Sequence, residues 1–518
     1  MKKNKKYLII AGIALVALVG VLLALLFWPK GESDPNAAID TGTDITTSVD
    51  ENGVHQASLV LNDNGGLDVN SYGTLIEYTP ADISEIHIEN TKGSFDIKSY
   101  TPKTTDEEGD EITQTTEYTL VGYEDFELQS GKPDAVANNL ATVEFTSVAS
   151  IDGKDSGSFG FDNPRSVAEV TYTDGTKAVV TVGSEAPAGA GVYVKFGSGD
   201  TIYLVASTSV DALLYGVTDL ISLSVNDAVQ SDVSSDPSSV TLSGSHFGEE
   251  IEFVANTNTA VSASYMITKP AELIADDSTA SKVTGAIRGL YAESVTYVNP
   301  SADQISASGL SEPYARVVGV YEDKTVDLIA SAPDSEGKVN IMENGGRVIY
   351  VMASANLPWT TLDYEDLVSP YVLNPSMTAI KTMTVNDGSK DYEFEISSET
   401  STVTDSNGSE TTTTQTSVRC GALNLTTENF SAYYQNVVYT EKVDESADSP
   451  SGSPALTIKY SYINSDHTDT VEFYETDSGK YIAVLNGAAV GTVYQSRINK
   501  LIQQTPLAAA DEVVEAIT

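Results

Sequence analysis

Residues 160–182 read GFDNPRSVAEVTYTDGTKAVVTV, and the outline of this stretch returns twice further along the chain. A Gly-x-x-x-Pro element is followed by two strand-like runs and then by Ile-Tyr-Leu-Val at 202–205. A second copy begins at Gly309, 149 residues later, and reaches Ile-Tyr-Val-Met at 349–352. A fainter third copy starts near Leu456 and ends with Val-Tyr-Gln-Ser at 493–496. Self-similarity at a long period indicates one structural unit used several times.

Each copy is preceded by alternating apolar residues on both sides of a turn, which is the period-two pattern of a β-hairpin. The turns are expected at residues 90–93, 243–247 and 386–388. The last of them reads Asn-Asp-Gly, and these residues tolerate the positive φ of a tight hairpin. The apolar positions are Ile83, Ile86, Ile88, Phe95 and Ile97; Val240, Leu242, Ile251 and Phe253; and Ile380, Met383, Val385, Tyr392, Phe394 and Ile396. Return strands are expected at 118–121, 265–268 and up to Cys420, the first and last after polar tips at 106–110 and 405–409.

One amphipathic helix is expected after each hairpin, because apolar residues recur at helical spacing. Pro133 begins the first helix, Asp277 or Ser278 caps the second, and Thr426 or Thr427 caps the third. Their apolar residues are Val136, Leu140 and Val143; Val283, Ile287 and Leu290; and Phe430, Tyr433, Tyr434 and Val437. A helix on an antiparallel sheet predicts an α+β fold, here as three related antiparallel-sheet-plus-helix repeats. We place the repeats at 76–218, 219–370 and 371–518, with the third divergent.

The N-terminal segment Tyr7–Trp28 is apolar and carries no charge. As a helix its 22 residues would span roughly 33 Å, close to the hydrocarbon thickness of a bilayer. Four lysines lie within residues 1–6, so the positive-inside bias places that tail in the cytoplasm. The alternative is a cleaved signal peptide, which has a shorter apolar core and a small-x-small cleavage site. We therefore predict an uncleaved transmembrane helix at 7–28, a flexible spacer with lead-in strands at 29–75, and an extracytoplasmic remainder.

The composition is strongly acidic. The chain has 28 basic and 74 acidic residues, and the part after the four-lysine tail has a formal charge of −50. Such a charge disfavours nucleic acid and anionic lipid and favours basic partners, although its simplest meaning is a solvated surface. With 41% hydrophobic and 20% charged residues, the chain is not a disordered acidic tail. Cys420 is the only cysteine, which excludes an internal disulfide, and its strand-like context favours a core position over a nucleophile.

Motifs that would carry chemistry are not found. The histidines His55, His87, His246 and His467 lack metal-binding spacing, and His87 is expected to face outward on a strand. Residues 62–65 read Asn-Asp-Asn-Gly but lack the later glutamate of a calcium loop, so a turn explains them better. The nearest approaches to a nucleophile elbow, at 153–157 and 244–248, place the serine off centre and also indicate turns.

Tyrosines are abundant at strand positions and are interpreted as sheet packing. They are Tyr172, Tyr193, Tyr203, Tyr350 and Tyr494. With so many acidic residues, a glycosidase-type carboxylate pair stays open as a minor alternative. We predict no catalytic, cofactor-binding or metal-binding residues, no cofactor and no enzymatic activity.

The stretch that opens with Gly160–Pro164 resembles a bacterial family known as domain of unknown function 4340. The resemblance runs through Asp174-Gly175, Val182-Gly183 and Val192–Val194 to Ile202–Val205. The helix expected at 133–145 and the single N-terminal anchor also fit this family. The resemblance implies a membrane-tethered extracytoplasmic accessory protein, often encoded beside ABC-type transport systems of the gliding-motility type. It implies no catalytic residues.

Three functions follow from these observations. The first is a non-enzymatic, single-pass accessory or docking protein of the cell membrane, with subunits of an ABC-type transporter as partners. The second is a cell-envelope binding or adhesion protein that uses the repeats as spacers. The third is a hydrolase acting on wall material. The first is the expectation carried forward.

Overall fold

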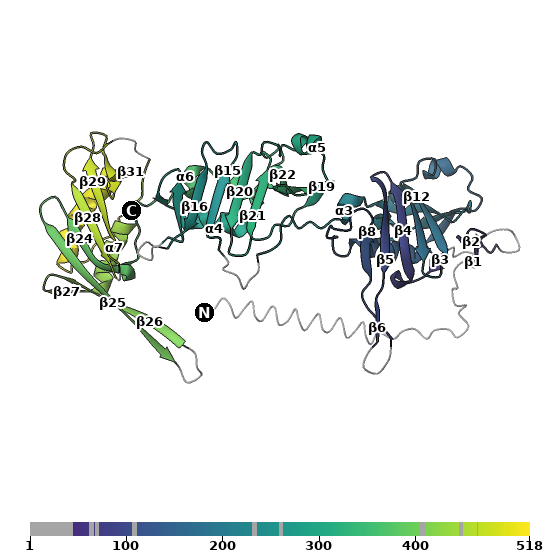
Figure 1. The fold of residues 1–518 in the computed structure, drawn as a ribbon, viewed down its shortest axis with the longest axis horizontal. Coiled ribbons are helices and arrows are strands. Elements are labelled where there is room, and N and C mark those ends of the chain that lie inside the picture. Colours follow the sequence, from purple (N-terminus) through teal and green to yellow (C-terminus); the bar gives the residue numbers. More distant parts are fainter. Residues whose placement is uncertain are drawn as a thin grey trace. The chain divides into compact units, whose positions relative to one another are not determined.

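The computed structural model describes residues 45–517 apart from 62–66, 68–71, 106–110, 230–235, 258–262, 405–409, 445–448 and 464 (Figure 1). Antiparallel sheets dominate these residues, so the predicted α+β class is wrong and the fold is mainly β. By contact the chain forms two units, Met1–Asp125 with Ser130–Gly216, and Phe126–Gln129 with Val217–Thr518. The predicted limits of the three repeats stay a prediction.

The large sheet of the first unit has the strand order β10-β14-β13-β12-β11-β4-β5-β8. Its strands are β4 (Ile83–Asn90), β5 (Gly93–Tyr100), β8 (Glu117–Leu120), β10 (Ser147–Ser150), β11 (Ser166–Tyr172), β12 (Lys177–Glu185), β13 (Val192–Phe196) and β14 (Ile202–Val205). Every second residue of β11 is buried, so one face of the sheet forms the core. Helix α2 (Lys132–Ala141) buries Val136 and Leu140, and the Tyr172 hydroxyl donates to the Leu140 carbonyl at 2.8 Å. This bond ties the helix to the core face.

Smaller strand pairs accompany this sheet. They are β1 (Ile45–Val49) with β2 (His55–Leu59), β3 (Gly73–Glu77) with β9 (Thr142–Phe145), and β6 (Lys103–Thr105) with β7 (Glu111–Thr113). The first predicted helix was expected to include Val143. This part of the prediction is wrong, because Val143 belongs to strand β9. Val143 and Phe145 are buried while Glu144 is exposed, and this alternation lets the chain leave the helix and pair as a strand.

The first sheet of the second unit has the order β18-β17-β16-β15-β20-β21-β22-β23-β19. Its strands are β15 (Ser239–Ser243), β16 (Ile251–Ala255), β17 (Tyr265–Lys269), β18 (Leu273–Ile274), β19 (Ser294–Val298), β20 (Ala315–Val320), β21 (Thr325–Ala330), β22 (Lys338–Glu343) and β23 (Val348–Ala353). Its helices are α3 (Val217–Leu220), α4 (Asp277–Ala286), α5 (Ala302–Ala307) and α6 (Tyr364–Leu367). The cap of α4 is Asp276 rather than the predicted Asp277 or Ser278, and the helix ends before Ile287 and Leu290.

The other sheet of the second unit has the order β27-β26-β25-β24-β28-β29-β30-β31. Its strands are β24 (Ile380–Asn386), β25 (Asp391–Thr404), β26 (Glu410–Cys420), β27 (Leu423–Leu425), β28 (Leu456–Tyr462), β29 (Thr468–Glu475), β30 (Lys480–Leu485) and β31 (Ala488–Tyr494). Helices α7 (Thr427–Val438) and α8 (Gln495–Ala509) contribute Phe430, Tyr433, Ile498 and Leu501 to its core. Thr426 caps α7, one of the two predicted positions.

Strands β25 and β26 extend beyond this sheet as a two-stranded ribbon (Figure 1). The pairing of β25 with β24 ends at Glu395, and that of β26 with β27 begins at Val418. Among the residues that the structure describes, 397–404 and 410–417 therefore pair only with each other in the strand ladder. We call this segment the ribbon arm. At about 3.4 Å per residue, β25 is roughly 48 Å long.

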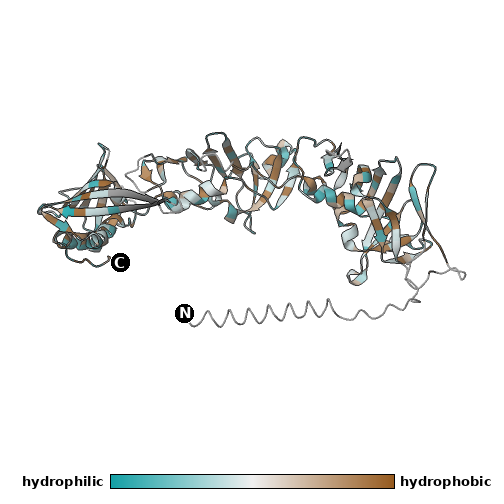
Figure 2. Cartoon of the chain, turned by 90° about the horizontal axis from the view of Figure 1, so that it is seen from below, coloured by the Kyte–Doolittle hydropathy of each residue, from teal (hydrophilic) through white to brown (hydrophobic). Residues whose placement is uncertain are grey.

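Seven strands occur in the same order in all three large sheets. The orders are β8-β5-β4-β11-β12-β13-β14, β17-β16-β15-β20-β21-β22-β23 and β26-β25-β24-β28-β29-β30-β31. The predicted hairpins are confirmed as β4–β5, β15–β16 and β24–β25. Gly160 and Gly309, which open the Gly-x-x-x-Pro elements, both have left-handed φ, at 88° and 74°. Figure 2 shows the hydrophobic and hydrophilic residues alternating along the strands.

The predicted N-terminal transmembrane helix is not part of this fold, because Tyr7–Trp28 lies outside the described residues. Within those residues, none of the helices combines the length and the apolar character needed to cross a membrane. The predicted turn at 62–65 and the hairpin tips at 106–110 and 405–409 also lie outside the described part of the chain.

Candidate functional site

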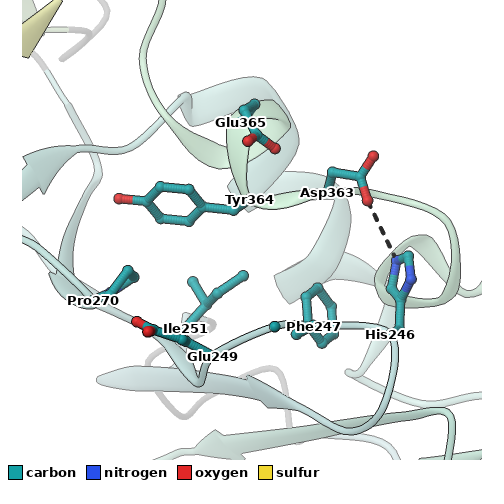
Figure 3. A pocket seen from close by; sticks show the side chains of 9 residues that line it. His246, Phe247, Glu249, Ile251, Pro270, Asp363, Tyr364 and Glu365 are labelled. Atoms are coloured by element: carbon teal, nitrogen blue, oxygen red, sulfur yellow. Dashed lines mark ion pairs between the residues drawn. The ribbon is translucent and has the colours of Figure 1, made fainter. Parts of the chain in front are cut away.

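A pocket of about 320 Å³ lies beside the turn that joins β15 to β16 (Figure 3). The turn begins at Gly244, where φ is 117° and a Cβ atom would lie 2.5 Å from the Tyr314 carbonyl oxygen. Only glycine fits this close approach. The backbone N–H of His246 then donates to the same carbonyl at 2.8 Å, which fixes the turn against the segment that enters β20. We call the cavity the His246 pocket.

His246 is held at one end of this pocket by both of its ring nitrogens. Nε2 lies 2.8 Å from the Leu362 carbonyl oxygen, to which it donates, and Nδ1 lies 2.9 Å from the Tyr314 hydroxyl. The imidazole is also stacked on the Tyr314 ring, with 4.8 Å between ring centroids. Its side chain is only 12% exposed. Because both nitrogens are engaged, His246 is not placed to exchange a proton with a ligand.

Three exposed carboxylates surround the opening, namely Glu249, Asp363 and Glu365. Asp363 lies 4.0 Å from the His246 ring and is the cap residue of α6, where it forms a capping box with Asp366. Helix α6 is anchored by the Leu367 carbonyl, which accepts from the Asp276 backbone N–H at 2.7 Å. The three carboxylates therefore belong to two segments that are far apart in the sequence, and backbone hydrogen bonds hold each segment in place.

Apolar groups line the space between these carboxylates. Ile251, which is 2% exposed, lies with Phe247, Pro270 and Tyr364 along the pocket wall. Figure 3 shows the ring of Tyr364 near Pro270 and Ile251, and His246 and Asp363 at the other end. Apolar walls with carboxylates at the rim suit the aliphatic stem and charged end of a lysine or arginine. The ring of Tyr364 adds a face on which a cation can rest.

The other histidines lie apart from this pocket. His55 contacts Tyr78 and Thr176, and His87 is exposed on β4 and paired with Asp96 at 2.6 Å, as its outward prediction requires. His467 contacts the buried Asp469 at 2.9 Å. In the described part of the chain, no group of three or more His, Cys, Asp or Glu side chains is placed to hold a metal ion.

The predictions for Cys420 and for the tyrosines have mixed outcomes. Cys420 packs against the core of the last sheet, and burial raises the pKa of its thiol. Tyr172, Tyr203 and Tyr350 are buried as predicted. Tyr494 is 58% exposed, so its interpretation as sheet packing is wrong. It is the last residue of β31, where the strand gives way to a helix and the alternation no longer implies a covered face.

The sequence interpretation missed the His246 pocket. The turn at 244–248 was recognised only as a turn, and its partner segment at 363–365 follows 115 residues after Gly248. The clustering of acidic residues in each segment is a weak signal in a chain with 74 of them.

The family model "Domain of unknown function (DUF4340)" matches residues 118–235. This range includes the Gly160–Pro164 element on which the resemblance was based, and it excludes the His246 pocket. A comparison with curated proteins finds no match. A comparison with solved structures also finds none.

Proposed function

We propose that this protein is a non-enzymatic accessory or docking protein at the outer face of the cell membrane, which acts by contact with a basic partner. Subunits of an ABC-type transport system are the proposed partners. The membrane location is supported by the sequence of Tyr7–Trp28 and its preceding lysines. The partner class is suggested by the resemblance to the DUF4340 family.

The His246 pocket is the observation that best supports action by contact. It offers apolar walls and three carboxylates to a cationic side chain, and its histidine has both nitrogens occupied. Three carboxylates around one opening attract a basic group over distances set by the ionic strength. The pocket thus suits recognition of a basic residue on a partner surface.

The test is recovery of partners from native membranes in mild detergent with the full chain as bait. We expect wild type to recover membrane transporter subunits, and recovery to fall as salt is raised. The variant Glu249→Gln/Glu365→Gln removes two rim charges while it keeps their shapes. Exposed ion pairs contribute about 0.2–1 kcal/mol each, so the loss of two should lower the affinity by about two- to thirtyfold.

The matched control is Glu322→Gln/Asp323→Asn, which makes the same charge change in the exposed turn between β20 and β21. It should leave recovery within about twofold of wild type. Equal losses in both variants would assign the effect to overall charge and would remove the pocket from the proposal. Recovery of wall polymer without any membrane protein would favour the envelope-binding function instead.

A further inference from the structure

A second pocket, of about 380 Å³, lies where β31 meets α8 in the last sheet. Three cationic side chains line it, namely Lys442, Arg497 and Lys500, against the single carboxylate of Glu441. The whole chain has 28 basic and 74 acidic residues, so three bases around one cavity run against its overall charge. We call this cavity the Arg497 pocket.

The Arg497 guanidinium is fixed in place by backbone carbonyls. Nη1 donates to the Ile517 carbonyl at 2.9 Å and Nη2 donates to the Asn436 carbonyl at 2.8 Å. These bonds join α8 to the end of α7 and to the C-terminal segment. The Nε atom is buried and has no hydrogen-bond partner among the described residues. A cation in this setting is incompletely paired, and an anion in the pocket would lower its free energy.

The remaining walls of this pocket are apolar and partly open to solvent. Tyr494 is 58% and Val443 36% exposed, and Val493 and Ile517 also line the cavity. Exposed apolar side chains next to cations indicate a ligand with both an anionic and an apolar part. Ser496 and Arg497 belong to the first turn of α8, which contains no acidic residue and has no side-chain cap. The positive end of the helix dipole therefore adds to the three cations.

We propose that the Arg497 pocket binds an anionic amphiphile, a molecule with one phosphate or carboxylate head and a short apolar body. The head group lies against Lys442, Arg497 and Lys500, and the apolar body lies along Tyr494 and Val443. Free alkyl phosphates and the head groups of anionic lipids share this chemistry. The proposal is independent of the docking function, because the two pockets have no residue in common.

The test uses the full chain in phosphatidylcholine nanodiscs, with empty discs as the blank, and calorimetric titration with hexyl phosphate. Inorganic phosphate supplies the head alone and 1-hexanol the tail alone. We expect hexyl phosphate to bind at least about tenfold more tightly than either. Equal binding of 1-hexanol would show an unspecific apolar slot, and equal binding of inorganic phosphate would show a simple anion site; either result overturns the proposal.

Variants locate the site. Lys500→Gln removes an exposed cation of the pocket, and a lost charged contact should raise the Kd of hexyl phosphate about tenfold. Tyr494→Ser should weaken hexyl phosphate while leaving inorganic phosphate unchanged. Lys459→Gln, an exposed lysine of β28 outside the pocket, is the matched control and should change the Kd less than twofold. Equal effects of Lys500→Gln and Lys459→Gln would overturn the site.

A final experiment identifies the source of the ligand. Discs that contain phosphatidylglycerol offer a membrane head group as competitor. If the Lys500-dependent part of hexyl phosphate binding becomes weaker in these discs, the pocket takes lipid head groups. If that part is unchanged, the ligand is a soluble amphiphile. Both results support the proposal, whereas absence of any component sensitive to Lys500→Gln overturns it.

Discussion

The Tyr321 hydroxyl is a buried polar group that has no hydrogen-bond partner in the described part of the second unit. Tyr321 is 4% exposed, and no hydrogen bond to its hydroxyl is present among the described residues. Burial raises the pKa of this phenol to about 12, with smaller effects from Arg288, Tyr265 and Asp236. A buried and unpaired hydroxyl costs stability, since it loses its hydrogen bonds to water.

Tyr321→Phe should therefore increase the free energy of unfolding at pH 7 by about 1 kcal/mol. Its advantage should grow above pH 10. There the tyrosine of the unfolded chain loses its proton, while the folded phenol stays neutral until about pH 12. Between about pH 10 and about pH 12, the free energy of unfolding therefore decreases more in wild type than in Tyr321→Phe. Urea unfolding at pH 7 and pH 11 measures both effects.

Tyr350→Phe is the matched control, because this tyrosine is also buried in the second unit and its hydroxyl donates to the Ser224 carbonyl at 2.8 Å. Burial raises the pKa of Tyr350 to about 12 as well. At pH 7 this variant should lose about 1 kcal/mol rather than gain it. A loss of the same size in Tyr321→Phe would mean that Tyr321 has a hydrogen-bond partner.

At the scale of elements, helix α4 depends on its cap. The Asp276 carboxylate accepts from the Thr279 backbone N–H at 2.8 Å, which satisfies one of the free donors of the first turn. Asp276→Ala should cost about 1 kcal/mol of unfolding free energy. Trp359 is the reporter, since it is fully buried in a short helical turn that packs against α4. A Trp28→Phe background leaves it as the only tryptophan.

Asp303→Ala is the control for this cap variant. Asp303 lies in the first turn of α5 but is not its cap residue, which is Ser301. Its loss should weaken only the interaction with the helix dipole, by about 0.5 kcal/mol or less. If both variants shift the urea midpoint of Trp359 fluorescence equally, the cap bond of Asp276 has no special role.

Sequence patterns were sufficient for the hairpins and insufficient for the helix ends. Ile86, Ile88, Phe95 and Ile97 alternate strictly on either side of a turn, so only one strand register buries them. Helical spacing continued from Leu140 to Val143, yet Thr142–Phe145 also alternates, and pairing with β3 decided the outcome. The α+β prediction treated one helix per repeat as a full layer, whereas each of the three large sheets has eight or nine strands.

Neither pocket could be predicted from the sequence, for a physical reason. Each combines short segments from distant parts of the chain, such as 246–251 with 363–365 and 441–443 with 493–500. Their proximity results from strand order and from the packing of helix ends. No local periodicity reports such contacts. For the Arg497 pocket, the sign in the sequence was Tyr494, a large residue at a strand end where no covering face is assured.

At the scale of the whole molecule, the dominant quantity is charge. The part of the chain after the four-lysine tail has a formal charge of −50, and like charges repel between molecules as well as within one. At 0.15 M salt this repulsion decays over about 8 Å, and at 1 M over about 3 Å. Added salt should therefore let neighbouring molecules approach one another.

Once neighbouring molecules approach one another, we expect the ribbon arm to determine whether they associate. Both of its edges leave backbone N–H and C=O groups without strand partners, and residues 397–404 and 410–417 contain neither lysine nor proline to block edge pairing. We expect nanodiscs with one copy each to stay dispersed in 0.02 M NaCl and to cluster reversibly in 1 M NaCl, as measured by light scattering. Replacing residues 398–416 with Asn-Gly should abolish the clustering. Colloidal stability then depends on two opposing effects, attraction at the edges of the ribbon arm and electrostatic repulsion between the acidic molecules. Clustering that persists after the ribbon arm is removed would disprove this explanation.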